Sequence, residues 1–396
     1  MAQYQVTLDH QLLNQLFIGE SRDAGVAALL ETVLNQVLKA QATEQLAASE
    51  YERTPDRQGQ RNGSYNRSLT TRVGSINLQI PRFRDGKFST ELFKRYQRSE
   101  QALVLTLMEL VINGVSTRKV ARVTEELCGR EFSKSTVSEL CKHLDPIVQG
   151  WNNRSLHEVA YPFVTVDAMY VKVREDGRIR SRGVFIGYGV NTDGNREILG
   201  LAVGDTESEA SWGSFFNQLK ERGLNGVDCI TSDTHGGLVK AIRQHFQGVT
   251  WQRYQTHFVK NILDAAPKSL QASIKGMVRS IFEAPNVEIA RKCLKDTLNA
   301  FQEKAPKAMD TLENGFDDAT AVLVYPEEYR VRLRTSNGIE RVNGEIRRRE
   351  RVIRIFPNRE AVVRMIGSVL MEIEAHWESS RKFMDMSAYH EWCKTR

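Results

Sequence analysis

Between residues 162 and 257, short runs of apolar and β-branched residues alternate with amphipathic stretches, a pattern typical of an α/β core. Two stretches with apolar residues at helical spacing, 207–223 and 236–246, predict helices. Five apolar runs predict strands, at residues 162–173, 181–190, 196–205, 227–233 and 249–255. The resulting order, with three strands before the first helix, predicts a mixed sheet with helices packed on it.

The segments before this core also show regular patterns. Ile76, Leu78 and Ile80 alternate with polar residues, which predicts a half-buried strand that Pro81 closes. An earlier helical stripe must be buried either against the rest of the chain or against a second subunit, and the sequence leaves both open. This stripe consists of Val26, Leu29, Leu30, Val33, Leu34, Val37 and Leu38.

Residues 101–147 return to a helical pattern. Ser116 is placed to cap a helix that Gly129 would end, and Ser133 or Ser135 is placed to cap a second helix. Two short helices joined by a tight turn fit a helix-turn-helix, whose second helix enters the DNA major groove. A plain helical hairpin has the same pattern, but the arginine-rich segment upstream favours DNA binding.

Charge is unevenly distributed along the 396 residues, although the formal net charge is only +6. Residues 51–100 carry 11 Lys and Arg against 5 Asp and Glu, and residues 332–354 carry 8 Arg against 3 Glu. Each island has a bland alternative, a solvated surface face. Local clusters of basic charge nevertheless suit a polyanion, so both islands are predicted to meet the DNA backbone.

Other features exclude several classes of protein. No stretch approaches the about 20 consecutive apolar residues that cross a bilayer, and no secretory signal is visible, so we expect a cytoplasmic globular protein without a membrane partner. The 5 cysteines are scattered and never spaced as CxxC, which argues against a disulfide framework or a zinc ribbon. The GxxxxGK, HExxH and GxSxG motifs are absent.

Two aspartates stand where an ordinary structural role is a weaker explanation. Asp167 lies inside an apolar strand run, where burying an uncompensated carboxylate costs roughly several kcal/mol. Asp233 follows the fourth strand, at the kind of strand end where ligands gather in α/β sheets, although it could simply cap the next helix. Two aspartates from neighbouring strands could approach one divalent cation, because hard cations prefer oxygen ligands.

The choice of a third acid stays open on pattern alone. Residues 335–352 predict a helix with three candidates, Glu340, Glu345 and Glu350. Glu340 shares a face with Asn343, whereas Glu345 lies about 140° around the helix, so both cannot serve one site. Glu340 also has a structural alternative, a capping box with Asn337.

Several long blocks in a fixed order resemble the Mutator-type transposases of bacterial insertion sequences, from about Arg61 to Trp377. The strongest are RNGSYNRSLTTRVGSINLQIPRFRDGKF, GVSTRKVARVTEELCG, FSKSTVSELCKHLD, VDAMYVKVRE, SDTHGGLVKAI and SNGIERVNGEIRRRERVIRIFPN. The resemblance implies a ribonuclease-H-like mixed-sheet catalytic core with an Asp-Asp-Glu triad. The aspartates match Asp167 and Asp233, and the glutamate matches Glu340 rather than Glu345.

The resemblance also implies the chemistry: DNA strand cleavage and strand transfer with two Mg²⁺ or Mn²⁺ ions held by the triad. His257, His235 and Asn343 would be accessory residues near the site. The family usually has Cys or Asp, two residues and then His after the fifth strand, whereas this chain has Tyr254 at the first position. An all-helical insertion would precede the glutamate-bearing helix.

The expected partner is double-stranded DNA, both the terminal inverted repeats and the target, bound by a homodimer because paired ends need paired active sites. Sequence and resemblance together assign DNA contact to the two basic islands and the second helix of the helix-turn-helix. The residues are Arg61, Arg67, Arg72, Arg82, Arg84, Lys134, Arg347, Arg348, Arg349 and Arg351.

The predicted domains follow from these segments. Residues 1–60 form an N-terminal helical segment with a possible dimer contact, and residues 61–150 form a DNA-binding region. The catalytic core consists of residues 151–257 and 333–380, and the helical insertion consists of residues 258–332. The competing hypothesis is a catalytically inert, sequence-specific DNA-binding protein derived from a transposase. Such a protein would need the basic islands but not three acids.

Overall fold

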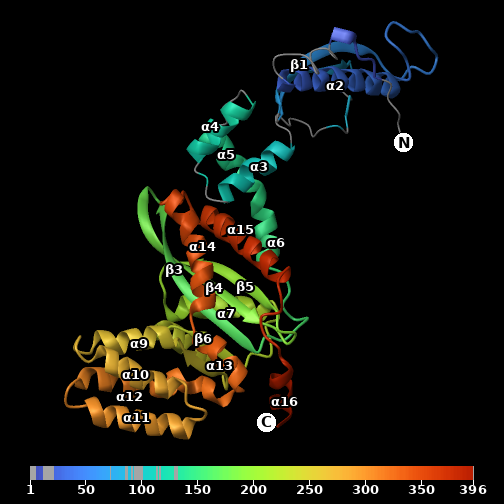
Figure 1. Cartoon of the computed structure of the whole chain (residues 1–396). Coiled ribbons are helices and arrows are strands. Elements are labelled where there is room, and N and C mark those ends of the chain that lie inside the picture. Colours follow the sequence, from blue (N-terminus) through green and yellow to red (C-terminus); the bar gives the residue numbers. More distant parts are fainter. Residues whose placement is uncertain are drawn as a thin grey trace. The chain divides into compact units, whose positions relative to one another are not determined.

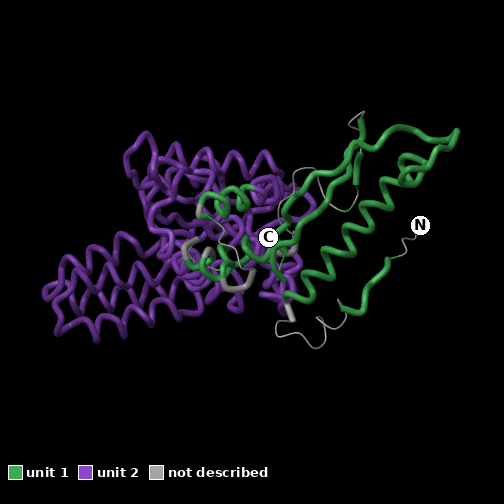
Figure 2. Tube along the Cα trace, turned by 90° about the horizontal axis from the view of Figure 1, so that it is seen from above, with its two compact units in different colours: residues 1–142 green, residues 143–396 purple. Residues whose placement is uncertain are grey.

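The computed structural model describes residues 6–11, 22–71, 73–84, 88–90, 92, 101–112, 115, 117–128 and 133–395. The chain divides into two compact units, residues 1–142 and 143–396 (Figure 2). None of the described helices is both long enough and apolar enough to span a lipid bilayer.

In the first unit, helix α2 (Arg22–Leu46) packs on a hairpin of β1 (Arg61–Thr71) and β2 (Gly74–Phe83) (Figure 1). Its Leu30, Leu34 and Leu38 join a core made by apolar residues of the hairpin, Leu69, Ile76, Leu78 and Ile80. Packing within the chain therefore accounts for these three leucines of the predicted stripe. The alternation of Ile76, Leu78 and Ile80 is confirmed as the buried face of β2.

The expectation that Pro81 closes this strand is wrong, because β2 continues to Phe83. Pro81 faces Ser64, next to an irregularity in β1 between Arg61 and Ser64. A two-stranded sheet has only edge strands, where the missing N–H of proline is tolerated.

The described residues of the first unit also form the helices α3 (Gln101–Ile112), α4 (Thr117–Cys128) and α5 (Lys134–Cys141). The structure selects Ser133 over Ser135 as the cap of α5, because the Ser133 hydroxyl accepts a hydrogen bond from the Thr136 N–H at 3.1 Å. Ser116 and Gly129 lie outside the described residues. The two predicted helices are confirmed, and their role in reading DNA stays a prediction.

The second unit is built on a five-stranded sheet, which confirms the predicted mixed α/β core (Figure 1). Its strands are β3 (Phe163–Glu175), β4 (Arg178–Val190), β5 (Arg196–Gly204), β6 (Cys229–Ser232) and β7 (Thr250–Arg253). The spatial order is β5-β4-β3-β6-β7, with β3, β4 and β5 antiparallel and β3, β6 and β7 parallel. Asp176 and Gly177, both with positive φ, form the tight turn between β3 and β4.

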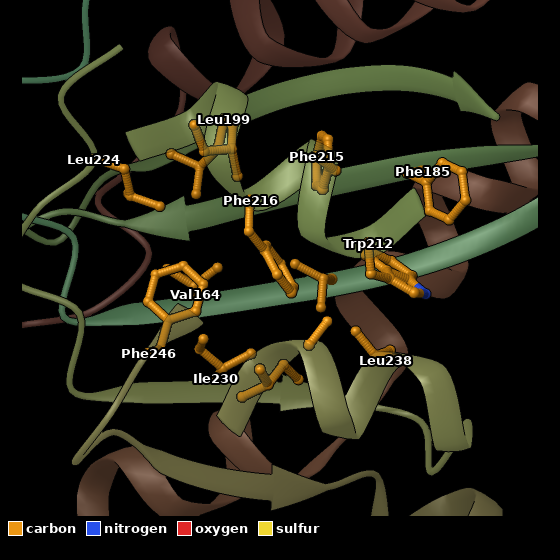
Figure 3. Packing of buried hydrophobic residues seen from close by; sticks show 14 of the residues in the cluster. Val164, Phe185, Leu199, Trp212, Phe215, Phe216, Leu224, Ile230, Leu238 and Phe246 are labelled. Atoms are coloured by element: carbon orange, nitrogen blue, oxygen red, sulfur yellow. The ribbon is translucent and has the colours of Figure 1, made fainter. Parts of the chain in front are cut away.

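Helices α7 (Glu209–Glu221) and α8 (Gly236–His245) cover one face of this sheet and enclose its main hydrophobic core (Figure 3). Strand residues Val164, Val166 and Phe185 pack there against α7 and α8 residues that include Trp212, Phe215, Phe216, Leu238 and Ile242. Because side chains alternate along a strand, this packing turns Asp167 toward the opposite face. Helices α14 (Asn337–Ile353) and α15 (Arg359–Glu378) lie on that face, where Trp377 packs on Tyr188.

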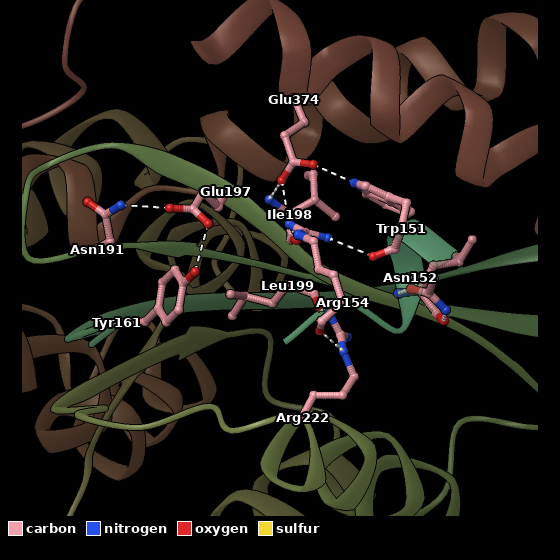
Figure 4. A network of polar contacts seen from close by, with 11 residues as sticks. Trp151, Asn152, Arg154, Tyr161, Asn191, Glu197, Ile198, Leu199, Arg222 and Glu374 are labelled. Atoms are coloured by element: carbon pink, nitrogen blue, oxygen red, sulfur yellow. Dashed lines mark hydrogen bonds and ion pairs between the residues drawn. The ribbon is translucent and has the colours of Figure 1, made fainter. Parts of the chain in front are cut away.

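Strand β5 forms one edge of the sheet, and polar side chains close it (Figure 4). Asn152, at the end of α6 (Asp145–Asn152), donates to the Leu201 carbonyl at 2.9 Å and accepts from the Leu201 N–H at 2.8 Å. Glu374 of α15 accepts from the Ile198 N–H at 2.8 Å, and Arg154 donates to the Ile198 carbonyl at 2.6 Å. Backbone groups that a further strand would otherwise satisfy are therefore paired with side chains.

The chain between β7 and α14 is helical, as α9 (Gln255–Asp264), α10 (Gln271–Phe282), α11 (Val287–Phe301), α12 (Pro306–Thr320), the 3₁₀ turn η2 (Ala321–Val324) and α13 (Glu327–Arg334). Helices α9 to α12 share a separate core around Phe258, Ile274 and Phe316. The C-terminal helix α16 (Ser387–Thr395) packs its Tyr389 beside Phe163 and Tyr329. The predicted domain boundaries remain predictions.

Candidate active site

Asp167 lies in the middle of β3, on the face that α14 covers. Its carboxylate accepts hydrogen bonds from the Ala168 N–H at 2.9 Å and from the Asn343 amide at 2.7 Å. Burial raises the pKa of Asp167 to about 6, and the nearby charge of Asp233 adds to the rise, although the two hydrogen bonds and His257 oppose it. Ionising this carboxylate is therefore costly in the metal-free protein.

Asp233 directly follows β6, at the end of a parallel pair of strands. Its carboxylate accepts a hydrogen bond from the Thr234 N–H at 2.7 Å, and the Tyr254 N–H binds the Ser232 carbonyl at 2.9 Å, so the ends of β6 and β7 are tied together. The alternative role as the cap of α8 does not apply, because His235 holds the N-cap position.

His257, in the first turn of α9, lies between two of the predicted acids. Its Nδ1 is 3.5 Å from Asp233 Oδ2, and its Nε2 is 3.7 Å from Glu340 Oε1. The interaction with Asp233 raises the pKa of His257 and lowers the pKa of Asp233. The imidazole thus links the acid after β6 to the acid on α14.

Glu340 is in the first turn of α14, where a negative charge is favoured by the N–H groups of the helix end. Its carboxylate accepts a hydrogen bond from the Ser336 hydroxyl at 2.5 Å. Ser336, not Asn337, is the N-cap residue, so the alternative of a capping box with Asn337 is wrong. The sequence interpretation missed Ser336, although a serine just before a helix is a recognisable capping signal.

Asn343 lies one turn after Glu340 on α14, and its bond to Asp167 fastens this helix to β3. Glu345 is directed elsewhere, because it pairs with Arg348 at 3.2 Å and also contacts Arg349. The structure therefore brings Asp167, Asp233, Glu340, His257 and Asn343 together and leaves Glu345 out.

Tyr254, which stands where the family usually has Cys or Asp, is fully buried. Its hydroxyl donates to the Val166 carbonyl at 3.2 Å, one residue before Asp167, and its ring packs edge-on against His257 at 5.5 Å between centroids. This tyrosine supports the backbone beside Asp167 and one side of His257.

His235 does not join this cluster through any of the contacts that the structure gives to the described residues. His235 stands at the start of α8, and its Nδ1 lies 3.6 Å from Glu207 Oε1. Of the two histidines predicted near the site, only His257 contacts the acids.

The arginines after Glu340 differ in their surroundings. Arg347, Arg348 and Arg351 are exposed. The prediction that Arg349 meets DNA does not fit its side chain, which is only 4% exposed and is paired with Glu372 at 3.0 Å and with Glu345. Arg349 follows Ile339, Val342 and Ile346 on the buried face of α14, and this spacing was the sequence signal for its position.

The N-terminal basic residues also divide into groups. Arg61 is tied to the end of α2, donating to Thr43 at 2.9 Å and to the Ala48 carbonyl at 3.0 Å. Arg82 is exposed and lies over the Tyr65 ring at 4.8 Å, and Arg84 is exposed beside it in the chain. Arg67 is half-buried, while Arg72 and the side chain of Lys134 lie outside the described residues.

The chemistry of the donor set fits a hard divalent cation. The three acids offer anionic oxygens, which such ions prefer, and the buried Asp167 carboxylate makes no close ion pair with a basic side chain among the described residues. As they stand, no three His, Cys, Asp or Glu side chains in the described part of the chain are arranged to hold an ion.

The chain is similar to a family of known proteins over most of its length. Residues 1–380 match the family described as "Transposase, Mutator family". The chain is 45% identical over 388 residues to the transposase for insertion sequence element IS256 in transposon Tn4001 of Staphylococcus aureus, covering 97% of this chain and 99% of that protein. It is 39% identical over 371 residues to the transposase for element ISRM5 of Rhizobium meliloti, covering 94% and 93%.

A further relative is the transposase for insertion sequence element IS1081 of Mycobacterium tuberculosis, 36% identical over 359 residues, with 90% of this chain and 86% of that protein covered. Among solved structures, a match to a Mos1 transposase paired-end complex with left transposon end covers 60% of this chain and 82% of that chain, with a TM-score of 0.19 and 13% identity. The family match and the three relatives show that this chain belongs to the Mutator family of transposases, enzymes of insertion sequence elements.

Proposed function

We propose that this transposase binds the terminal inverted repeats of its element and cleaves and joins DNA strands with Asp167, Asp233 and Glu340 as its catalytic triad. One observation carries the proposal. Three acids from a central strand, a parallel strand end and a covering helix meet around His257 and Asn343, although 66 and 107 residues separate them along the chain. Such convergence of acids, one of them a buried carboxylate that is costly to ionise, marks functional sites.

The three carboxylates would hold two Mg²⁺ or Mn²⁺ ions. Bound ions supply Lewis-acid stabilisation for the attacking and leaving oxygens of phosphoryl transfer. Asn343 keeps the Asp167 carboxylate oriented, Ser336 does the same for Glu340, and His257 keeps Asp233 beside Glu340. In cleavage, a water oxygen attacks the phosphorus and the bond to the strand's 3′ oxygen breaks. In joining, the freed 3′-hydroxyl oxygen loses its proton and attacks a phosphorus of a second strand, while the bond from that phosphorus to the 3′ oxygen of its own strand breaks and that oxygen takes up a proton as a new 3′-hydroxyl.

The sheet order supports a ribonuclease-H-like core. Three antiparallel strands, β3 to β5, come first in the chain, and β6 and β7 then join β3 in parallel, with Asp167 on the first strand and Asp233 after the fourth. The helical segment between β7 and α14 corresponds to the proposed insertion domain.

For DNA recognition, we assign the terminal repeats to the first unit, with α5 as the reading helix and Arg82 and Arg84 on the backbone. Arg347, Arg348 and Arg351 would hold the backbone beside the triad, now without Arg349. The enzyme would act as a homodimer in the bacterial cytoplasm, because two element ends need two active sites. An inert DNA-binding derivative would have no need of three converging acids.

The decisive experiment follows strand cleavage and joining on labelled element-end DNA with Mg²⁺, comparing wild type with Glu340→Gln. Joining should depend on the metal and vanish in this variant, while binding to the end persists. Glu345→Gln is the matched control, since it alters a glutamate of the same helix that faces Arg348, and it should keep activity.

The possible results separate the hypotheses. Activity that survives Glu340→Gln but disappears in Glu345→Gln would show that Glu345, and not Glu340, is the third metal-binding acid. A wild type that binds ends tightly and never cuts or joins would favour the inert DNA-binding protein.

A further inference from the structure

The far end of the β3–β4 hairpin projects beyond the rest of the sheet. Strand β6 pairs only with residues Phe163 to Thr165 of β3, whereas β3 and β4 remain paired as far as Glu175 and Arg178. The outer part of this ribbon is basic. Its exposed cations are Lys172, Arg174, Arg178 and Arg180.

Little of this charge is neutralised by the hairpin's own acids. Glu175 is engaged by Arg359 at 2.5 Å and by the buried Arg182. Asp176 lies 3.6 Å from Arg180. Lys172, Arg174 and Arg178 form no ion pair with any acid in the described part of the chain, so their charge faces solvent.

The turn after α14 is fastened to this ribbon. The Phe356 N–H donates to the Lys172 carbonyl at 2.8 Å, and the Arg174 N–H donates to the Phe356 carbonyl at 2.8 Å. Arg354, at the end of α14, has a φ of 64°, a costly conformation for a residue other than glycine, and its side chain is exposed. The strained turn thus joins the exposed arginines of α14 to those of the hairpin.

The position and shape of the ribbon match double-stranded DNA. Lys172 is five residues beyond Asp167 on the same strand, about 16 Å at 3.3 Å per residue. Arg178 and Arg180 pair with Glu175 and Val173, so they lie on the face of the ribbon that Asp167 occupies, within the reach of one duplex bound at the triad. Lys172 and Arg174 project from one face of the ribbon, and Arg178 and Arg180 from the other. Beyond the Phe356 contact the ribbon is two-stranded and fits the about 12 Å wide major groove, where cations on both faces would meet the phosphates on either side.

We propose that the end of the β3–β4 hairpin, with the Arg354 turn, binds the phosphate backbone of DNA that lies outside the terminal repeats of the element. The inference rests on the proposed function and extends it to a surface of the catalytic unit. Lysine and arginine contacts to phosphate carry no sequence information, which suits DNA of variable sequence. Donor DNA flanking the element and target DNA share this chemistry.

The test compares two triple variants. The hairpin variant carries Lys172→Ala, Arg174→Ala and Arg178→Ala, and the control variant carries Lys292→Ala, Lys295→Ala and Lys307→Ala. The control removes the same charge from exposed positions on α11 and α12. A conservative variant, Lys172→Arg with Arg174→Lys and Arg178→Lys, keeps the charge. The substrates are a pre-cut repeat end, the same end with donor flank, and a target plasmid.

Removal of three phosphate contacts should lower the slope of log affinity against log salt for non-repeat duplex by about 3. Binding of the pre-cut end should stay at the wild-type level, as should all properties of the control and conservative variants. Loss of about tenfold in joining pre-cut ends to the plasmid identifies target DNA as the ligand. Loss confined to cleavage of flanked ends identifies donor flank instead.

An unchanged salt slope together with wild-type cleavage and joining would overturn the proposal. Equal losses in the hairpin variant and its α11–α12 control would also overturn it. If the wild type neither cuts nor joins DNA, the proposed function fails, and the salt slope on non-repeat duplex then tests the hairpin surface by itself.

Discussion

Asp167 is the residue at which the fold bears a clear electrostatic cost. Its carboxylate is buried in β3 and its pKa is raised to about 6, mainly by burial and also by Asp233. The hydrogen bonds from Ala168 and Asn343 only partly offset this effect. A cation bound at the proposed site would offset this cost by favouring the ionised carboxylate.

The sign of this effect gives a first prediction. In the unfolded chain Asp167 loses its proton near pH 4, so stability falls as pH rises from there to 6, and above pH 6 the loss is complete. Asp167→Asn should therefore stabilise the metal-free protein by about 3 kcal/mol at pH 8 and progressively less toward pH 4. Urea unfolding at several pH values with chelator measures this. A gain that does not depend on pH would contradict it.

Neighbouring arginines of α14 should behave differently, which gives a second prediction. Arg349→Ala leaves Glu345 and Glu372 facing each other without the buried guanidinium, and should cost about 2–3 kcal/mol of unfolding free energy. Arg348→Ala, at a side chain 57% exposed, should leave stability within about 0.5 kcal/mol and weaken DNA binding instead. Urea unfolding and gel-shift titration of both variants separate the two roles.

At the scale of elements, the close approach of α14 to the sheet positions Glu340. A Cβ at Gly338 would lie 2.4 Å from the Tyr188 hydroxyl oxygen of β4, too close for any real contact. Glycine at this position therefore lets the start of the helix pack on the strand. Glu340 follows two residues later, so its carboxylate depends on that packing.

Gly338→Ala should push the first turn of α14 outward and reduce cleavage by about 10²-fold, since small misplacements of catalytic groups are costly. Tyr188→Phe added to this variant should restore much of the rate, because it removes the clashing oxygen and leaves the ring carbon Cζ at 3.2 Å. Gly344→Ala on the same helix meets no atom within 4 Å and is the control. Single-turnover cleavage measures all three, and no rescue by Tyr188→Phe would refute the explanation.

The sequence could predict the strands because their apolar runs are short and bounded by turn residues, as in 162–173 and 181–190. It also marked Asp167, because an acid inside such a run needs a reason. Glu340 required the family resemblance, since Asn337 offered an equally good local role that only the position of Ser336 excludes. Arg349 looked like its neighbours because charge dominates the RRRER run and hides the helical spacing of its buried face.

Across the chain, the proposed triad lies entirely in the unit of residues 143–396, and the proposed repeat-reading helices lie in the unit of residues 1–142. The larger unit has its own hydrophobic core between the sheet and α7 and α8. Recognition and chemistry are therefore assigned to parts of the chain with separate cores.

This division predicts that the fragment 143–396 folds without the first unit. It should unfold in one cooperative transition and retain metal-dependent nicking of DNA, while losing its preference for terminal repeats over random duplex. Calorimetry and competition binding test both parts. A fragment that does not fold would contradict the prediction that residues 143–396 fold by themselves. A fragment that still prefers terminal repeats would show that the second unit recognises them.

The closed edge of β5 has a consequence for association between copies of the chain. An open edge strand is a template for strand addition, which leads to shared sheets and aggregates. Asn152, Arg154 and Glu374 already occupy the backbone groups of Ile198 and Leu201 on this edge. Copies that gather on DNA ends, as we propose for this enzyme, can therefore meet through side-chain surfaces without polymerising through this edge of their sheets.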